Sequence, residues 1–120
     1  MTRQELLDLC LTFPDTYEDA PFDDPNWTVV RHRANRKCFA MLFEREGKLC
    51  INLKCEPMLA EFFRRVYVGV TPGYHMNKEH WNTVLPDSDV PTDTFYAMIR
   101  ESYDRTRPKT RRARKETPHE

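Results

Sequence analysis

Three short runs of aromatic, β-branched and aliphatic residues follow one another closely, and they most constrain the fold of this chain. They are WTVVRHR at 27–33, KCFAMLF at 37–43 and KLCINLK at 48–54. Such residues favour strands, and the segments that connect the runs are only three and four residues long. Parallel neighbours would need a crossover of about a dozen residues, so these strands can pair only as antiparallel neighbours. The sequence therefore predicts an antiparallel meander.

The turn between the second and third runs decides which side chains face the core. Gly47 can adopt a left-handed conformation, which suits a type I turn closed by a bulge. A plain two-residue turn would shift the pairing and send the other set of side chains inward. We expect the bulged turn because it buries the larger side chains. It places Phe39, Met41 and Phe43 beside Leu49, Ile51 and Leu53, whereas the plain turn would bury Cys38, Ala40 and Leu42.

Helical patterns precede and follow these strands. Thr2 and Glu5 form a capping box, and Pro14 stops the helix, which we place at about residues 3–12. Pro57 suits the first position of a second helix, and a third helix runs over about residues 92–105. The apolar residues expected to face the core are Leu6, Leu7, Cys10, Leu11 and Phe13, then Met58, Leu59, Phe62, Phe63 and Val66, then Phe95, Met98, Ile99 and Tyr103.

The segments between these elements are less regular. The acidic, proline-punctuated stretch 15–26 leaves room for a short edge strand around Tyr17–Ala20. Proline and glycine at 72 and 73 have the signature of a type II turn. A last hairpin is expected to pair residues 74–77 with 80–85. The chain is thus predicted to be an α+β domain over residues 1–105, with an antiparallel sheet covered by helices on one side.

The formal net charge of zero conceals an asymmetry. Residues 105–120 carry seven basic and two acidic side chains, and the other 104 residues carry twelve basic and seventeen acidic ones. From Thr106 on the chain has one apolar residue, Ala113, so we expect residues 106–120 to form a basic, disordered tail. Basic tails of this kind meet nucleic acid or acidic partners.

The composition indicates a cytoplasmic protein without a membrane segment. No apolar run approaches the length of about 20 residues that spans a bilayer, and the first ten residues lack the apolar region of a signal peptide. The four cysteines are scattered, and we interpret them as reduced thiols that pack as small apolar residues. Their spacing with the histidines fits no zinc motif. We therefore expect neither a metal nor a cofactor.

The histidines and Trp81 are the remaining candidates for chemistry. His75 and His80 lie five residues apart and could approach each other across a hairpin, but a catalytic metal site needs a third ligand. His32 stands between two arginines and is expected to be exposed. Trp81 lies in a β-rich run, and we predict that it is a buried core residue under the third helix. The alternative is an exposed ring that stacks on bases or on a partner.

The segment YHMNKEHWNTV at 74–84 resembles the signature of the MmcQ/YjbR family of small bacterial proteins. Three further pieces agree in order: KCFA at 37–40, LK at 53–54 and SY at 102–103. The resemblance extends over about residues 3–105, and the segment at 74–84 is its most specific part. The basic tail is no part of the family pattern.

The resemblance implies a CyaY-like two-layer α/β sandwich, in which an antiparallel sheet carries helices on one side. Members of the family are commonly described as DNA-binding through β-hairpin wings, and no catalytic residues are assigned to them. Carried over to this sequence, the candidate contacts are Asn77, Lys78, His80 and Trp81 in the hairpin and Lys37 and Lys54 on the strands.

We therefore expect a monomeric, non-enzymatic protein that binds DNA with little base specificity, mainly through phosphate contacts of its tail. The tail residues concerned are Arg105, Arg107, Lys109, Arg111, Arg112, Arg114 and Lys115. One alternative is a protein-interaction module whose acidic residues 1–30, with seven acids and one base, dock a basic partner. A further alternative is an enzyme that uses His75 and His80.

Overall fold

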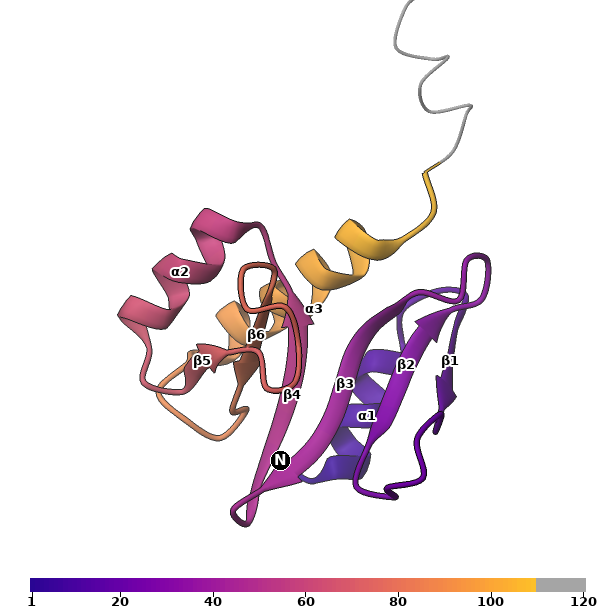
Figure 1. Ribbon diagram of the computed structural model, residues 1–120, viewed down its shortest axis with the longest axis horizontal. Helices are drawn as coiled ribbons and strands as arrows, with labels where there is room; N and C mark the ends of the chain where they lie inside the picture. Colours follow the sequence, from indigo (N-terminus) through magenta and orange to yellow (C-terminus); the bar gives the residue numbers. More distant parts are fainter. Residues whose placement is uncertain (110–120) are drawn as a thin grey trace, which may run out of the picture.

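The computed structural model describes residues 1–109 of the chain. In these residues, four consecutive strands follow the first helix and two follow the second, before the last helix (Figure 1). The elements are α1 (Arg3–Leu11), β1 (Thr16–Asp19), β2 (Thr28–His32), β3 (Cys38–Arg45), β4 (Lys48–Lys54), α2 (Pro57–Val66), β5 (Val70–Pro72), β6 (Trp81–Val84) and α3 (Thr92–Thr106). The candidate positions Arg111, Arg112, Arg114 and Lys115, and the predicted disorder of the tail beyond Lys109, lie outside the described residues.

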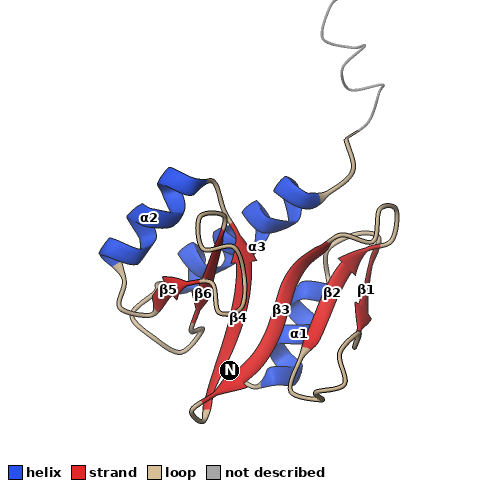
Figure 2. Cartoon of the chain, in the orientation of Figure 1, coloured by secondary structure: helices blue, strands red, loops and turns tan. Residues whose placement is uncertain are grey.

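The six strands form one antiparallel sheet in the order β1-β2-β3-β4-β6-β5 (Figure 2). The meander β1 to β4 follows the chain, and β6 then pairs with β4 while β5 takes the edge. The strand near Tyr17, the three central strands and the antiparallel pairing are confirmed. The predicted class, an α+β sandwich with helices on one side of an antiparallel sheet, is therefore correct.

One face of the sheet carries the main core. Buried side chains of α1 and α3 pack there against buried residues of the strands. The principal members are Leu6, Leu7 and Cys10 of α1, Val30, Phe39, Ala40, Leu42, Ile51, Leu53 and Val84 of the sheet, and Phe95, Met98, Ile99 and Tyr103 of α3. We call this side the helix face and the opposite side the open face.

The predicted pairing of the central hairpin was wrong. Arg45 pairs with Lys48, so the connection is a two-residue turn, and both of its residues, Glu46 and Gly47, have positive φ angles. Ala40 and Leu42 therefore lie on the helix face, as the plain turn requires. The size argument failed because Phe43 is also fully buried, under other aromatic rings on the open face.

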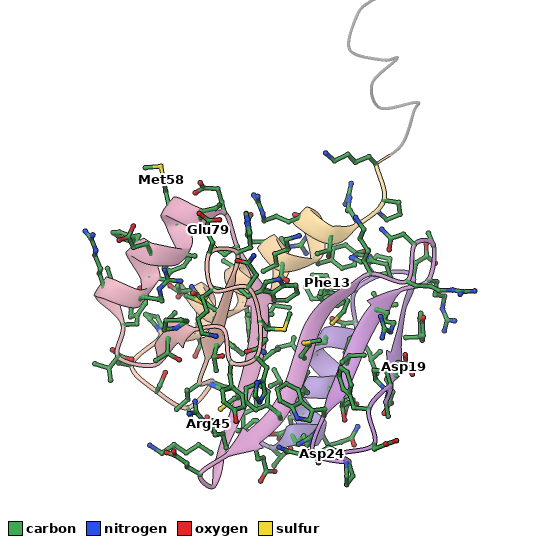
Figure 3. All side chains as sticks on the ribbon, in the orientation of Figure 1. Phe13, Asp19, Asp24, Arg45, Met58 and Glu79 are labelled. Carbon is green, nitrogen blue, oxygen red and sulfur yellow. The ribbon has the colours of Figure 1, made fainter. Side chains whose placement is uncertain are left out.

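The helix boundaries agree closely with the prediction, and the capping box of α1 is present. Pro57 takes the first turn of α2, and the Glu56 carboxylate caps it by accepting hydrogen bonds from the N–H groups of Leu59 and Met58, which lower the pKa of Glu56. The predicted burial of the α2 apolar face was wrong. Met58, Leu59, Phe62 and Val66 are exposed, and Figure 3 shows Met58 pointing away from the body.

One further prediction, the last hairpin, was wrong. The last strand pair is formed by β5 and β6, and residues 73–80 between them form a loop instead of a hairpin strand and turn. Helix α3 ends at Thr106, one residue beyond its expected end, and Thr106 is 4% exposed. Among residues 1–109, no helix is long and apolar enough to cross a membrane.

Candidate nucleic-acid interface and the open face of the sheet

The turn between β2 and β3 is joined to the last turn of α3. His32 Nε2 lies 2.8 Å from the Thr106 hydroxyl, and the Asn35 side-chain amide donates to the Thr106 carbonyl at 3.0 Å. The Thr106 hydroxyl itself donates to the Ser102 carbonyl at 2.7 Å. These contacts, between residues more than 70 positions apart, fix the turn beside the point where the tail leaves the domain (Figure 1).

This junction gathers basic side chains from two distant parts of the sequence. We call it the basic end, and it comprises Arg33, Arg36 and Lys37 of the turn with Arg105, Arg107 and Lys109 of α3 and the residues after it. Arg105 and Arg107 pair with Glu101 and Asp104 of the same helix, at 3.4 Å in both cases. No ion pair engages the other four within the described part of the chain, and all six side chains are exposed.

Lys37 and Lys54 flank the open end of the central hairpin, so the structure brings them to the same end of the sheet. Lys37 is exposed at the basic end, and Lys54 is half-buried at the last position of β4. The Lys54 backbone N–H donates to the Ser102 hydroxyl of α3 at 2.9 Å. This bond holds the end of β4 against α3, while strand alternation directs the Lys54 side chain to the open face, as it does for its partner Trp81.

The loop between β5 and β6 uses its polar residues to build itself. The Lys78 ammonium donates to the Gly73 carbonyl at 2.9 Å, and the Asn77 side chain accepts from the Glu79 N–H at 2.9 Å. The first contact ties the two arms of the loop together, and the second is an Asx turn. Lys78 and Asn77 are therefore engaged within the loop, and the predicted wing hairpin is absent among the described residues.

The three histidines of the described chain lie in different environments. His80 is half-buried, with Nε2 3.6 Å from a Glu79 carboxylate oxygen, and His75 is exposed with a left-handed φ of 63°. The prediction that His32 is exposed was wrong, because it is 2% exposed between β2 and α3. This burial lowers the pKa of His32, and the charge of Arg107 lowers it further, while a hydrogen bond to the Tyr103 backbone opposes the change.

Trp81 lies on the side of the sheet opposite to the predicted one. Its neighbours Asn82 and Val84 face α2 and the core, so strand alternation directs Trp81 to the open face, where it is half-buried. Gly73 crosses directly over it: a Cβ at this position would lie 2.8 Å from the Trp81 Cβ. The prediction that Trp81 packs under the third helix was therefore wrong.

The open face carries an aromatic layer that the sequence did not reveal. The Trp27 ring stacks on Phe43 with centroids 4.3 Å apart, Tyr74 lies 5.6 Å from Phe43, and the Arg45 guanidinium lies 4.1 Å over Tyr74. Buried Asn52 holds the loop to the sheet by donating to the Tyr74 carbonyl at 3.0 Å. The only sequence signal was the presence of rings in two loops, Phe22 and Trp27 in one and Tyr74 and His75 in the other.

The cysteines lie in environments that raise their pKa values. All four cysteines are free, and burial raises the pKa of Cys10 to about 12 and of Cys38 and Cys55 to about 11. A thiol with such a pKa is a weak nucleophile at neutral pH. Within residues 1–109, no group of three or more His, Cys, Asp or Glu side chains is placed to hold a metal ion.

Comparison with known proteins agrees with this architecture. The model of the YjbR family matches residues 11–105. The protein YjbR of Escherichia coli (strain K12) is 34% identical over 103 residues, which cover 86% of this chain and 85% of YjbR. YyaQ of Bacillus subtilis (strain 168) is 28% identical over 118 residues, covering 89% of this chain and 99% of YyaQ. Both relatives are described as uncharacterised proteins.

Two solved structures share the fold. A crystal structure of a Pseudomonas syringae protein is 33% identical, covers 89% of this chain and all of its own, and has a TM-score of 0.79. A Deinococcus radiodurans protein is 31% identical, covers 96% of this chain and 86% of its own, and has a TM-score of 0.80. The family model, the relatives and the shared fold all lead to one conclusion: this chain belongs to the YjbR family.

Proposed function

We propose that this protein binds nucleic acid without catalysing a reaction on it, and that the basic end and the tail provide the phosphate contacts. The observation that carries the proposal is the pair of hydrogen bonds that join Asn35 and His32 to Thr106. They set the cations of the β2–β3 turn beside those of α3, directly before the basic residues at 110–115. The β2–β3 turn, α3 and the tail could therefore together neutralise the phosphates of one nucleic-acid strand.

The local ion pairs at this end do not compete strongly with phosphate. The pairs of Arg105 with Glu101 and of Arg107 with Asp104 are exposed and lie one helical turn apart. Pairs of this kind contribute about 0.3–0.5 kcal/mol in helices. A phosphate can therefore replace the carboxylate at little cost. The acidic remainder of the domain explains why the contact should be confined to one end.

Lys78 and Asn77 are less suited to this role than the sequence suggested. Their polar groups already bond within the loop, so a phosphate contact would break the bonds that shape it. His80 is half-buried beside an acid. We therefore keep Lys37 and Lys54 as the strand contacts of the proposed interface, together with the cations of the basic end and tail.

Fluorescence anisotropy of a labelled duplex, titrated with protein at several salt concentrations, tests the proposal. If about five cations neutralise phosphates, the slope of log affinity against log salt is roughly −4.5. The affinity then falls about 500-fold between 50 and 200 mM salt. Duplexes of unrelated sequence should bind alike, because phosphate contacts carry no base information. A slope near zero would refute the proposal.

Matched charge variants locate the surface. The double variant Arg33→Gln/Lys37→Gln removes two exposed cations of the basic end, and Lys48→Gln/Arg65→Gln removes two exposed cations elsewhere. We expect the first variant to reduce the slope by up to about 1.8, at 0.9 for each lost contact, and the second to leave it unchanged. Equal effects of the two variants would show that net charge alone matters.

The contribution of the tail is best measured in the full chain. A chain ending at Asp104 would lose Thr106, which is buried and bonded to His32, so it is not expected to fold normally. Replacing Arg111, Arg112, Arg114 and Lys115 by glutamine avoids this problem. We expect the largest loss of affinity from this variant, because it removes four cations. Unchanged affinity would show that the tail plays no part.

A further inference from the structure

A pocket opens on the open face of the sheet, at the end of the molecule away from the tail. It has a volume of about 350 Å³ and is lined by Phe22, Asp24, Trp27, Met41, His75 and Met76. Figure 3 places Asp24 at this end, together with Arg45. The pocket lies between the acidic loop at 20–27 and the loop between β5 and β6. It shares no residue with the basic end.

The walls of the pocket are rings set at large angles to one another. Phe22 meets Trp27 edge to face, with an interplanar angle of 76° and centroids 6.3 Å apart. The His75 ring is tilted by 47° to Trp27 at 6.0 Å. Met41 and Met76 add thioether groups. Phe22, Trp27 and His75 thus give the pocket a mainly aromatic wall, which we call the cage.

The groups that line the pocket favour a positively charged ligand. Asp24 lines the pocket and the exposed Asp23 precedes it, while the Arg45 guanidinium is engaged over the neighbouring Tyr74 ring at 4.1 Å. None of the lining residues is a lysine or arginine. Aromatic faces attract cations through their quadrupole, and quaternary ammonium ligands are recognised in this way. The negative rim and the ring faces therefore favour the same kind of ligand.

The cage is held in place by the sheet beneath it. Trp27 stacks on fully buried Phe43, and the backbone of Tyr74 bonds to the side chains of Asn52 and Thr83, at 3.0 and 2.8 Å. His75 follows with a left-handed φ of 63°, a conformation that is uncommon outside glycine and is found at ligand sites. Trp27 and the backbone before His75 are therefore held in place by the sheet, which reduces the ordering cost of binding at this part of the wall.

We propose that this pocket binds an alkylammonium group, in the form of either a quaternary ammonium compound or a lysine side chain. The ammonium lies against the faces of Trp27 and Phe22, near the Asp24 carboxylate. The methyl or methylene groups pack against the two methionines. This site is independent of the proposed nucleic-acid interface, since it uses another end of the molecule and ligands of the opposite charge.

Fluorescence titration of a Trp81→Phe variant tests the proposal, because Trp27 is then the only tryptophan. The probes are choline and its neutral isostere 3,3-dimethylbutanol, which has the same shape without the charge. We expect saturable quenching by choline and binding at least about threefold weaker by the alcohol. A third probe, N-acetyl-lysine amide, distinguishes the two sources of the ammonium group. Equal binding of choline and the alcohol would overturn the proposal.

Two variants and a control test the cage itself. Asp24→Asn and Phe22→Leu change exposed residues of the pocket, and Asp23→Asn changes an adjacent exposed acid that does not line it. We expect each of the first two variants to weaken choline binding about three- to tenfold and the control to bind like the parent. Parent-like binding by both cage variants would overturn the proposal. Circular dichroism verifies that each variant remains folded.

Discussion

The helices α2 and α3 both show a regular apolar face in the sequence, but the two faces have different surroundings. In α3, Phe95 is 2% exposed and Ile99 is 1% exposed, and both belong to the main core. In α2, Phe62 is 54% exposed and Met58 is 78% exposed, and Ala60 is the helix's one buried residue. An apolar stripe therefore predicts a helix well but does not state what covers it.

The cause of this difference lies in the sheet beneath each helix. The helix α3 lies over the long central strands β3 and β4, whereas α2 lies over the short edge formed by β5 and β6. Polar contacts help to hold α2 on this edge: the Asn82 side chain donates to the Ala60 carbonyl at 3.1 Å and accepts from Arg64 at 2.7 Å. Three- and four-residue strands offer too little surface to cover a ten-residue helix.

The largest expected effect follows from removing a core ring of α3. Phe95→Ala should lower the free energy of unfolding by about 3–5 kcal/mol, because it deletes a fully packed side chain and leaves a cavity. Urea denaturation followed by circular dichroism measures the change. A loss below about 1 kcal/mol would show that α3 is packed no more tightly than α2, and the comparison would fail.

A smaller effect on stability is expected from the protonation of His32, which contacts Thr106 at the end of α3. Burial lowers the pKa of His32 below its ordinary value of 6.5, so the unfolded chain binds the proton more tightly than the folded one. Stability from this group is full above about pH 6.5 and falls as the pH drops, by at most about 1.4 kcal/mol per pH unit. Urea denaturation at pH 8 and pH 5.5 measures the loss.

The matched variants for this test are His32→Gln and His80→Gln. The first should remove the component of the pH dependence that His32 supplies, while the second, at a half-buried position in a loop, should retain it. If His32→Gln keeps the same pH dependence as the parent, other groups are responsible, and the polar anchor of α3 contributes nothing to it.

The sequence predicted local features better than it predicted which surfaces meet. The capping box of Thr2, the start of α2 at Pro57 and the three central strands depend on neighbouring residues, and all were correct. The side of the sheet that Phe43 and Trp81 occupy depends on a one-residue shift in pairing and on what lies opposite. Because both faces of the central strands are buried, the size of a side chain did not reveal its side.

For the candidate nucleic-acid interface, too, the sequence did not reveal which distant segments meet. Lys37 and the tail were found from their charge alone, but Arg33 and Arg36 join them only through the contacts of Asn35 and His32 with Thr106. Their sequence separation of about 70 residues left no local signal. The aromatic layer around Trp27 likewise combines two distant loops, which no spacing rule connects.

The smallest expected effect comes from the same substitution as in α3, made on the exposed face of α2. Phe62→Ala should change the free energy of unfolding by no more than about 0.5 kcal/mol, because the ring already lies largely in solvent. The parent chain should also be equally stable at low and high protein concentration if it is a monomer. Urea denaturation of both proteins at two concentrations 50-fold apart measures this.

A stability that depends on protein concentration would change how the apolar faces of α2 and α3 compare. Exposed apolar patches often mark contacts between proteins. If a second copy covers α2, the parent becomes more stable as its concentration rises, since association favours the folded state by mass action. The Phe62→Ala variant would lose that dependence, and a Lys48→Gln variant, changed on the β3–β4 hairpin, would keep it. The apolar face of α2 would then be a buried face like that of α3, completed by another chain.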